Sequence, residues 1–221
     1  RDAAEQLVRE LTSEQAKAWP LEDAAAQEQL LAASRATENG VARAHLVDYH
    51  IEGGLLQELF THDGCGTLVS QQSFETLRQA TIHDVGGILE LIRPLEEAGI
   101  LVRRSRERLE QEINQFSILE RDGMVLGCAA LYPLANNTAG EVACVAIHPH
   151  YRNGKRGHTL LTYVEKKARA LGMQSLFTLT TQTAHWFMQQ GFEPVPVSAL
   201  PGDRQALYNF QRNSKVFRKT L

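Results

Sequence analysis

The chain has 221 residues, of which 43% are hydrophobic and 22% are charged, and its formal net charge at pH 7 is −3. A chain of this length can bury one good hydrophobic core together with a smaller appendage. The slightly acidic balance, without a basic half or a basic helix, argues against a general nucleic-acid-binding protein. Positive charge gathers in two short clusters, 103–106 and 152–156, which suit a small anionic ligand better than a duplex.

The three cysteines, Cys65, Cys128 and Cys144, are scattered and form no Cys-x-x-Cys pair. This usage is typical of a cytoplasmic protein and not of a disulfide framework. No apolar run approaches the ~20 residues that a membrane span requires, and no signal peptide is visible. We therefore expect a cytoplasmic protein without a membrane partner.

The first third of the chain alternates helical patterns with short apolar runs. In chain order, the expected elements are a helix over 1–19, an Ala- and Gln-rich helix up to residue 36, a strand over 41–49, a helix over 55–60 and a strand over 67–70. Pro20 and the pair Asn39-Gly40 end the two long helices. The polar stretch 71–75 is the best candidate for a linker.

The remaining residues begin with a hairpin pattern and continue with strands that alternate with helices. The expected strands are 78–81, 116–121, 124–132, 141–147, 176–180 and 206–211, and the expected helices are 84–97, 106–114, the segment after Gly157, and 184–190. Asp122-Gly123 is a strong hairpin signal between the second and third of these strands. The order predicts an α/β fold in which a mixed sheet carries helices on both faces.

The segment 141–161 is the most informative part of the chain. An apolar strand leads into a basic loop with two glycines, and a helix follows. Backbone N–H groups and the helix dipole make such a loop suitable for binding phosphate groups. A solvated basic connection explains the local pattern equally well. The loop is not a P-loop, because no Gly-Lys-Ser/Thr opens the helix.

Two motifs resemble the GNAT acetyltransferases. The first runs from Val145-x-x-His148-Pro149 into the basic loop, and the second is Ala184-His185-Trp186-Phe187 followed by Gly191-Phe192. The resemblance implies that the loop holds the pyrophosphate of acetyl-CoA, although Lys155 replaces the middle glycine of the family consensus. The donor-binding residues that it implies are Val145, Ile147, Arg152, Asn153, Gly154, Lys155, Arg156, Gly157 and His158.

Longer segments are similar to the bacterial N-acetylglutamate synthases, the amino-acid acetyltransferases of arginine biosynthesis. They are GILVRRSRERLEQEI from Gly99, GEVACVAIHP from Gly140, LTTQTAHWFMQQGFEPV from Leu179 and LYNFQRNSKVF from Leu207. This resemblance implies a GNAT domain over 73–221 that acetylates the α-amino group of L-glutamate.

The segment 45–67 resembles the end of the amino-acid-kinase domain of the same enzymes. We therefore expect 1–72 to be a remnant of that domain with its linker, and the natural protein to continue upstream. Arginine inhibits the full-length family enzymes, and Glu58, Gly64 and Gly66 are implied to border their arginine site. We expect weak or absent arginine binding by this chain. A homo-oligomer is an open possibility that the sequence does not decide.

Acetyl transfer to an amine requires a base, N–H donors for the oxyanion and a leaving thiolate. Glu141 is the candidate base, although an exposed glutamate at a strand end is the commoner case. GNAT proteins carry a bulge in this strand, so the resemblance points to the amides of Cys144 and Val145 as oxyanion donors. An acetyl-cysteine intermediate on Cys144 is less favoured than direct transfer. His185 is the candidate acid, because Phe187 stands where many family members have tyrosine.

A dicarboxylic acceptor needs guanidinium groups that bind its carboxylates. The candidates within the synthase-like segments are Arg103, Arg104, Arg204, and Arg212 with Ser214. We expect no metal, because no cysteine or carboxylate completes a ligand set with His148 and His150. Two alternatives stay open, a non-catalytic module that binds acetyl-CoA and an acetyltransferase for another amine.

Overall fold

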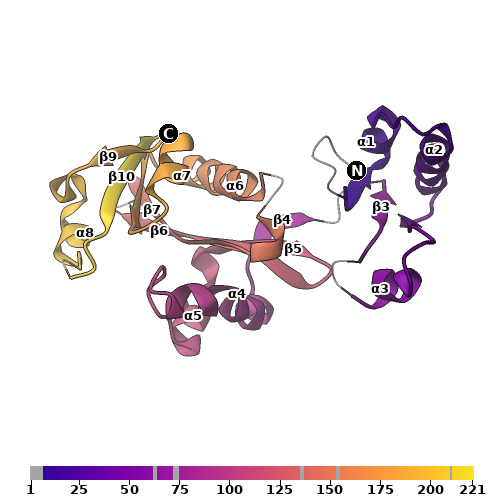
Figure 1. The fold of residues 1–221 in the computed structure, drawn as a ribbon. Helices are drawn as coiled ribbons and strands as arrows, with labels where there is room; N and C mark the ends of the chain where they lie inside the picture. The colour runs from indigo at the N-terminus through magenta and orange to yellow at the C-terminus, as the bar shows by residue number, and fades with distance from the viewer. Residues whose placement is uncertain (1–6, 62–63, 72–74, 135–136, 153–154, 210) are drawn as a thin grey trace. The chain divides into compact units, whose positions relative to one another are not determined.

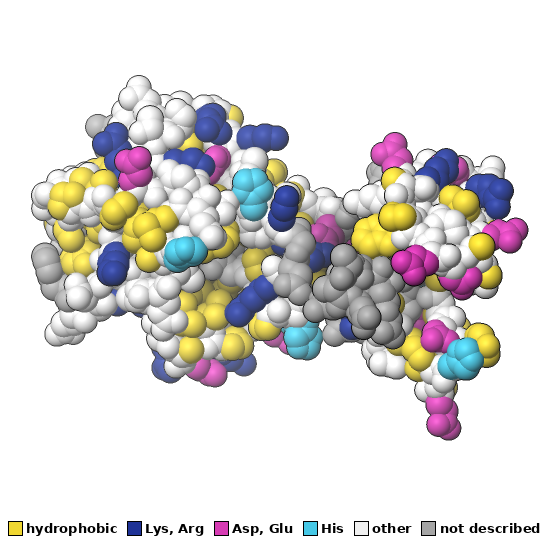
Figure 2. All heavy atoms as spheres, turned by 45° about the horizontal axis from the view of Figure 1, so that its top comes forward, with side chains coloured by type: hydrophobic (Ala, Val, Ile, Leu, Met, Phe, Trp, Pro, Cys, Tyr) yellow, Lys and Arg dark blue, Asp and Glu magenta, His cyan; other side chains and the backbone are white. Residues whose placement is uncertain are grey.

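The computed structural model describes residues 7–61, 64–71, 75–134, 137–152, 155–209 and 211–221, without the side chain of Asp203. The chain divides into two compact units, 1–74 and 75–221 (Figure 1). Each unit has buried hydrophobic clusters of its own. On the face that Figure 2 displays, acidic and basic side chains are interspersed.

The N-terminal unit is a small three-stranded sheet with helices. Its elements are β1 (Glu10–Thr12), α1 (Ser13–Ala18), α2 (Ala24–Glu38), β2 (Ala44–Leu46), α3 (Gly54–Phe60) and β3 (Thr67–Ser70). The strands lie in the order β1-β3-β2, with β1 parallel and β2 antiparallel to β3. Thr12 begins α1 through a capping box with Gln15. The predicted helix over 1–19 is therefore wrong over 7–12, where Glu10–Thr12 form β1, and its residues 1–6 lie outside the described residues.

The C-terminal unit is a seven-stranded mixed sheet with the strand order β4-β5-β6-β7-β8-β10-β9. Its strands are β4 (Thr76–Gln79), β5 (Phe116–Arg121), β6 (Met124–Leu134), β7 (Ala139–Ile147), β8 (Ser175–Thr180), β9 (Glu193–Val195) and β10 (Lys215–Thr220). The pair β7–β8 is parallel, and the other pairs are antiparallel. The mixed sheet predicted from the sequence is confirmed.

Helices cover both faces of this sheet, also as predicted (Figure 1). They are α4 (Val85–Glu97), α5 (Arg106–Glu112), α6 (Arg156–Ala170), α7 (Ala184–Gln189) and α8 (Gly202–Ala206), with short 3₁₀ turns at Ile82–Asp84, Ile113–Gln115, Pro149–Tyr151 and Val197–Ala199. Alternate residues of β6 serve the two faces: Cys128 and Ala130 pack in the cluster with α4 and α5, and Ala129 and Leu131 pack in the cluster with α6 and α7.

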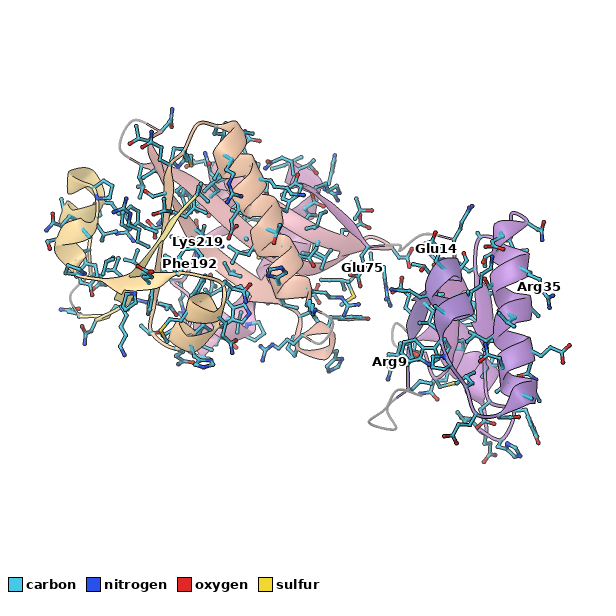
Figure 3. The ribbon with its side chains drawn as sticks, turned by 90° about the horizontal axis from the view of Figure 1, so that it is seen from above. Arg9, Glu14, Arg35, Glu75, Phe192 and Lys219 are labelled. Atoms are coloured by element: carbon cyan, nitrogen blue, oxygen red, sulfur yellow. The ribbon has the colours of Figure 1, made fainter. Side chains whose placement is uncertain are left out.

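The last strand differs from the prediction. Residues 206–211 were expected to be a strand, but Ala206 ends α8 and the strand β10 begins at Lys215. On β10, Lys219 donates to Glu165 of α6 over 2.6 Å and lies above the ring of Phe192 (Figure 3). This ion pair fastens the end of the chain to α6.

The parallel pair β7–β8 is joined at one end. The described pairing runs over Ala139–Glu141 of β7 and Ser175–Phe177 of β8, at the start of both strands. Further along β7 the register with β6 shifts, because a β-bulge interrupts it. Glu141 therefore lies where the two parallel strands begin to separate.

Candidate active site

The bulge in β7 is the structural centre of the site. The register between β6 and β7 shifts between Cys128 and Ala130, so that Cys144 and Val145 stand opposite a single residue of β6. Cys144 has a φ of +51°, a conformation that L-residues seldom adopt. A bulge leaves an unpaired residue in the ladder and turns its backbone groups away from the neighbouring strand. The bulge expected in this strand is present.

A cavity of about 540 Å³ lies beside this bulge, within the C-terminal unit. Residues of β6, β7 and β8 form its wall, and the loops before α5 and before β10 form its rim. It is lined by Ile100, Leu101, Val102, Arg104, Arg108, Tyr132, Leu134, Glu141, Ala143, Cys144, Leu179, Arg204, Leu207, Tyr208, Asn209, Arg212 and Ser214. Four of these are arginines, and Glu141 is the one acidic residue among the described lining.

Glu141 and Arg204 form a two-pronged ion pair in this cavity. Nη2 of Arg204 donates to Oε1 of Glu141 over 3.0 Å, and its Nε donates to Oε2. Both side chains are largely buried, with 11% of the glutamate and 20% of the arginine exposed. The hydrogen bond to Glu141 raises the pKa of Arg204, although burial opposes the shift. Two residues that were predicted for different tasks thus contact each other directly.

Arg104 lies at another corner of the cavity. Burial works to lower the pKa of its guanidinium, but the neighbouring Cys144, Tyr132 and Glu112 outweigh burial and raise that pKa. The Nε atom of Arg104 is buried and has no hydrogen-bond partner among the described residues. Tyr132 donates to Glu112 over 2.6 Å, and Glu112 also accepts from Nε of Arg108 over 2.8 Å. A buried, unpaired N–H in a cavity favours a ligand with an acceptor oxygen.

Cys144 lies in the same wall and contacts a second thiol. The Cys128 thiol donates to the carbonyl oxygen of Cys144 over 3.5 Å, and both cysteines are free and buried. A hydrogen bond between the two thiol side chains is the main cause that lowers the pKa of the Cys144 thiol, and Arg104 also lowers it. The same hydrogen bond and full burial raise the pKa of Cys128. The catalytic role considered for Cys144 stays a prediction.

The loop before β10 supplies the remaining polar groups. Arg212 donates through Nη2 to the carbonyl oxygen of Ile100, which brings this loop to the segment that follows α4. Tyr208 donates to the carbonyl oxygen of Ser214 over 2.6 Å. Arg204, Arg212 and Ser214 therefore share one cavity, as a common role in binding a substrate requires.

Two predicted residues lie elsewhere. Arg103 is exposed and does not line the cavity, whereas its neighbour Arg104 does. His185, the candidate acid, is exposed on α7 and is also absent from the described lining. Phe187 of the same helix is buried, with its ring centroid 4.9 Å from that of Trp186 and 5.4 Å from that of Phe192. Phe187 is therefore a core residue.

In the predicted donor loop, the backbone of Lys155 adopts a conformation that favours glycine. Lys155 precedes α6 with a φ of +62°, in the left-handed region that glycine adopts without strain. It stands where the family consensus has glycine. Asn153 and Gly154 of the same loop lie outside the described residues. Arg152 is exposed beside the start of α6, where the helix dipole favours an anion.

Other residues of the predicted donor loop have contacts within the protein. Arg156 donates through Nε to Glu75 over 2.7 Å (Glu75 is labelled in Figure 3). Gly157 faces Trp186, and a Cβ on it would lie 3.1 Å from that ring. His158 is paired through Nδ1 with Gln190 over 2.6 Å. Val145 and Ile147 also pack against the cluster that contains α6. Packing alone thus accounts for part of this motif.

In the N-terminal unit, Glu58 organises the glycine-containing loop. Its Oε2 accepts hydrogen bonds of 2.7 Å from the amides of Cys65 and Gly66, and its Oε1 lies 2.6 Å from Nδ1 of His45. Burial works to raise the pKa of Glu58, but these hydrogen bonds outweigh it and lower that pKa. A Cβ at Gly64 would overlap the carboxylate of Glu58. The residues implied in an arginine site here contact each other.

The sequence did not point to Arg108, Tyr132, Tyr208 and Asn209, which also line the cavity. Tyr132 is the clearest omission, because it lies directly opposite Glu141 in the register of β6 and β7. The alternating pattern of β6 places its side chain on the same face of the sheet as that of Glu141. Tyr132 could have been predicted from the sequence only if the register of the bulged pair β6–β7 had been known.

Residues 112–194 match the family described as acetyltransferase (GNAT) domain. The C-terminal unit has the GNAT acetyltransferase fold. The chain is 60% identical over 218 residues to the amino-acid acetyltransferase of Azotobacter vinelandii, and 57% identical over 222 residues to that of Pseudomonas aeruginosa. These matches cover 97% and 100% of this chain, but 50% and 51% of the relatives. The chain thus spans about half the length of these named relatives.

The C-terminal unit and the unit that precedes it together resemble a solved structure. N-acetylglutamate synthase from Neisseria gonorrhoeae, complexed with coenzyme A and L-arginine, aligns with a TM-score of 0.81 at 39% identity. The alignment covers 100% of this chain and 51% of that one. The same synthase complexed with coenzyme A and N-acetyl-glutamate gives a TM-score of 0.66 at 41% identity. The resemblance to the synthases predicted from the sequence is confirmed.

The described ranges hold neither a cluster of metal ligands nor a membrane-spanning helix. No group of three or more His, Cys, Asp or Glu side chains there could hold a metal ion. Over the same ranges, no helix is both long and apolar enough to cross a membrane.

Proposed function

We propose that this chain transfers the acetyl group of acetyl-CoA to the α-amino group of L-glutamate, the first step of arginine biosynthesis. The charge of the cavity is the main support. Its described lining holds Arg104, Arg108, Arg204 and Arg212 against the single carboxylate of Glu141. Such an excess of guanidinium groups favours an acceptor with two carboxylates. The names of the relatives support the same reaction.

In the proposed reaction, the amine nitrogen of glutamate attacks the thioester carbonyl carbon directly. A bond forms between nitrogen and carbon, the carbonyl oxygen becomes an oxyanion, and the carbon–sulfur bond then breaks to release the thiolate of CoA. Glu141 accepts the proton that the amine loses. The amides at the bulge, from Cys144 and Val145, stabilise the oxyanion. Holding both reactants together supplies much of the rate.

The acetyl-CoA site in this proposal lies along the bulge and the loop before α6. Lys155 and Arg152 offer positive charge there, at the N-terminal end of a fifteen-residue helix. Arg156 is paired with Glu75, so its role is to fix the start of α6. His185 lies outside the cavity, which leaves the thiolate to depart unassisted or with a proton from another group.

Domain roles, location and regulation complete the proposal. We assign acetyl transfer to 73–221 and treat 1–72 as the remnant of an amino-acid-kinase-like domain in a cytoplasmic protein. Arginine inhibition is assigned to full-length relatives only. In this chain, Glu58 contacts its own loop through Cys65, Gly66 and His45.

A thiol-release assay tests the proposal. Acetyl-CoA is incubated with the chain and, in turn, with glutamate, aspartate, glutamine and a diamine. Fastest release with glutamate is expected. Tight acetyl-CoA binding without release from any amine would favour the non-catalytic module instead. Faster release with the diamine would favour an acetyltransferase for another amine, since a diamine has no use for the cavity arginines.

A further inference from the structure

The ion pair between Glu141 and Arg204 has a consequence for the base. Both carboxylate oxygens of Glu141 accept hydrogen bonds from one guanidinium group. The pair lies in a largely buried wall, where a two-pronged charged pair is stronger than in water. A carboxylate held in this way has its charge compensated, and its lone pairs are directed at Arg204. In this arrangement Glu141 is not free to accept the proton of an amine.

Arg204 is the cavity arginine that holds Glu141. Arg212 donates to a neutral carbonyl oxygen, and Arg108 is paired with Glu112. Arg204 sits on the five-residue helix α8, and its Nη1 donates to the carbonyl oxygen of Leu207 over 3.3 Å. Its guanidinium therefore faces two partners, the base and its own short helix, at the edge of the cavity.

We propose that Arg204 selects the acceptor by holding Glu141 until a carboxylate of the acceptor takes its place. This inference rests on the proposed function, in which Glu141 is the base. One carboxylate replaces another on the same guanidinium, so Arg204 keeps a counter-charge throughout the exchange. The released Glu141 then has a free lone pair beside the amine. A carboxylate without its counter-ion accepts a proton more readily.

The exchange makes the acceptor carboxylate a condition of catalysis as well as of binding. An amine that lacks the carboxylate leaves the pair intact and meets a base whose oxygens are occupied. Selectivity then arises from suppression of the wrong acceptor, in addition to attraction of the right one. A simple clamp would provide only the attraction, and this difference can be measured.

The experiment compares Arg204→Ala with Arg212→Ala, a matched loss of a cavity arginine that does not contact Glu141. Thiol release from acetyl-CoA gives kcat/KM for glutamate and for glutamine and isoglutamine, which each lack one carboxylate. In Arg204→Ala we expect kcat/KM for at least one of the two amides to rise about tenfold above wild type, as loss of a charged pair permits. The value for glutamate falls. In Arg212→Ala we expect kcat/KM to fall for glutamate and to rise for neither amide.

Three results would overturn the inference. If Arg204→Ala lowers kcat/KM for glutamate and leaves kcat/KM for both amides unchanged, Arg204 only binds the carboxylate of the acceptor. If kcat/KM falls equally for all three substrates, the role of Arg204 is structural, and a lowered melting temperature of the variant would identify that role. If the wild-type chain releases no thiol with glutamate, the proposed function fails first and the inference fails with it.

A crystal structure of the wild-type chain with N-acetylglutamate provides a test that needs no variant. We expect Arg204 to contact a carboxylate of the ligand and to have left at least one oxygen of Glu141. The bidentate pair intact beside a bound ligand would contradict the exchange.

Discussion

At the scale of single residues, Glu141 is the proposed base. It is 8% exposed and lies opposite Tyr132, in a wall where its charged partner is Arg204. We expect Glu141→Gln to lower kcat by about 10²–10⁴-fold at neutral pH, the usual loss when a general base is removed. The loss should shrink at high pH, where solvent deprotonates the amine. Thiol release over a pH series measures both effects.

The control for this prediction is Glu110→Gln, which removes a carboxylate from an ion pair on the exposed face of α5. It should leave the pH profile unchanged. A Glu141→Gln enzyme whose profile parallels that of wild type would show that another group takes the proton.

Individual site residues were predictable to different degrees. The place of Glu141 in the cavity and the bulge at Cys144 were expected because the local motif around them carries the family resemblance. The choice between Arg103 and Arg104 was not predictable, because the turn after α4 decides which of two adjacent side chains enters the cavity. His185 was chosen as a titratable residue near Phe187, which stands at the tyrosine position of many family members, but in this chain the side chain of His185 on α7 is exposed and does not line the cavity.

At the scale of elements, the start of α6 depends on the conformation of Lys155. Its φ of +62° costs a side chain with a Cβ about 1 kcal/mol, but costs glycine nothing. We expect Lys155→Gly to be about 1 kcal/mol more stable than Lys155→Ala, although alanine is the better residue inside a helix. Because both variants lose the same charge, urea denaturation isolates the backbone effect. An alanine variant as stable as the glycine variant would refute it.

A second element-scale prediction concerns the joint between β4 and α4. Asp84 accepts from Nη1 and Nη2 of Arg78 at 2.7 and 2.8 Å, and from the amide and hydroxyl of Thr81. The hydrogen bonds from Arg78 are the main cause that lowers the pKa of Asp84 from 3.8 to about 2. This difference corresponds to about 2 kcal/mol of stability at neutral pH.

The lowered pKa of Asp84 makes the free energy of unfolding depend on pH. The folded protein holds the carboxylate more strongly than the unfolded chain does, so the stabilisation is present above pH 4 and is lost as the pH falls towards 2. Asp84→Asn should therefore be about 2 kcal/mol less stable than wild type at pH 7 and nearly equal to it at pH 2. Urea denaturation at both pH values measures this. Arg78→Ala should cost a similar amount, and the double variant little more than either single one.

The elements themselves were predictable where the pattern was local. The hairpin at Asp122-Gly123, helix α4 and strand β8 begin and end within a few residues of their predicted bounds. The strand β1 was missed because three residues become a strand only by pairing with β3, far along the chain. The strand expected over 206–211 was wrong. Ala206 ends α8, and Tyr208 is buried by packing beside β10 and not by pairing in a strand.

At the scale of the whole molecule, the two units differ greatly in the core that each buries. Among the described residues, the N-terminal unit has one small cluster of Leu11, Ala16, Leu30, Ala33 and Val69, whereas four separate clusters lie within 75–221. The entire described lining of the cavity also belongs to 75–221. Small domains bury a smaller fraction of their surface and are less stable for that reason.

We therefore expect the chain to unfold in two steps, with 1–74 melting first. A fragment of residues 75–221 should keep the second melting temperature within about 2 °C and should release thiol with glutamate at a similar kcat/KM, because its core and cavity are its own. Differential scanning calorimetry and the thiol-release assay measure the two properties. A fragment that melts more than about 5 °C lower would show that residues 1–74 contribute over 1 kcal/mol to the stability of the C-terminal unit. A fragment with an unchanged melting temperature but no activity would assign to residues 1–74 a part in forming the active site.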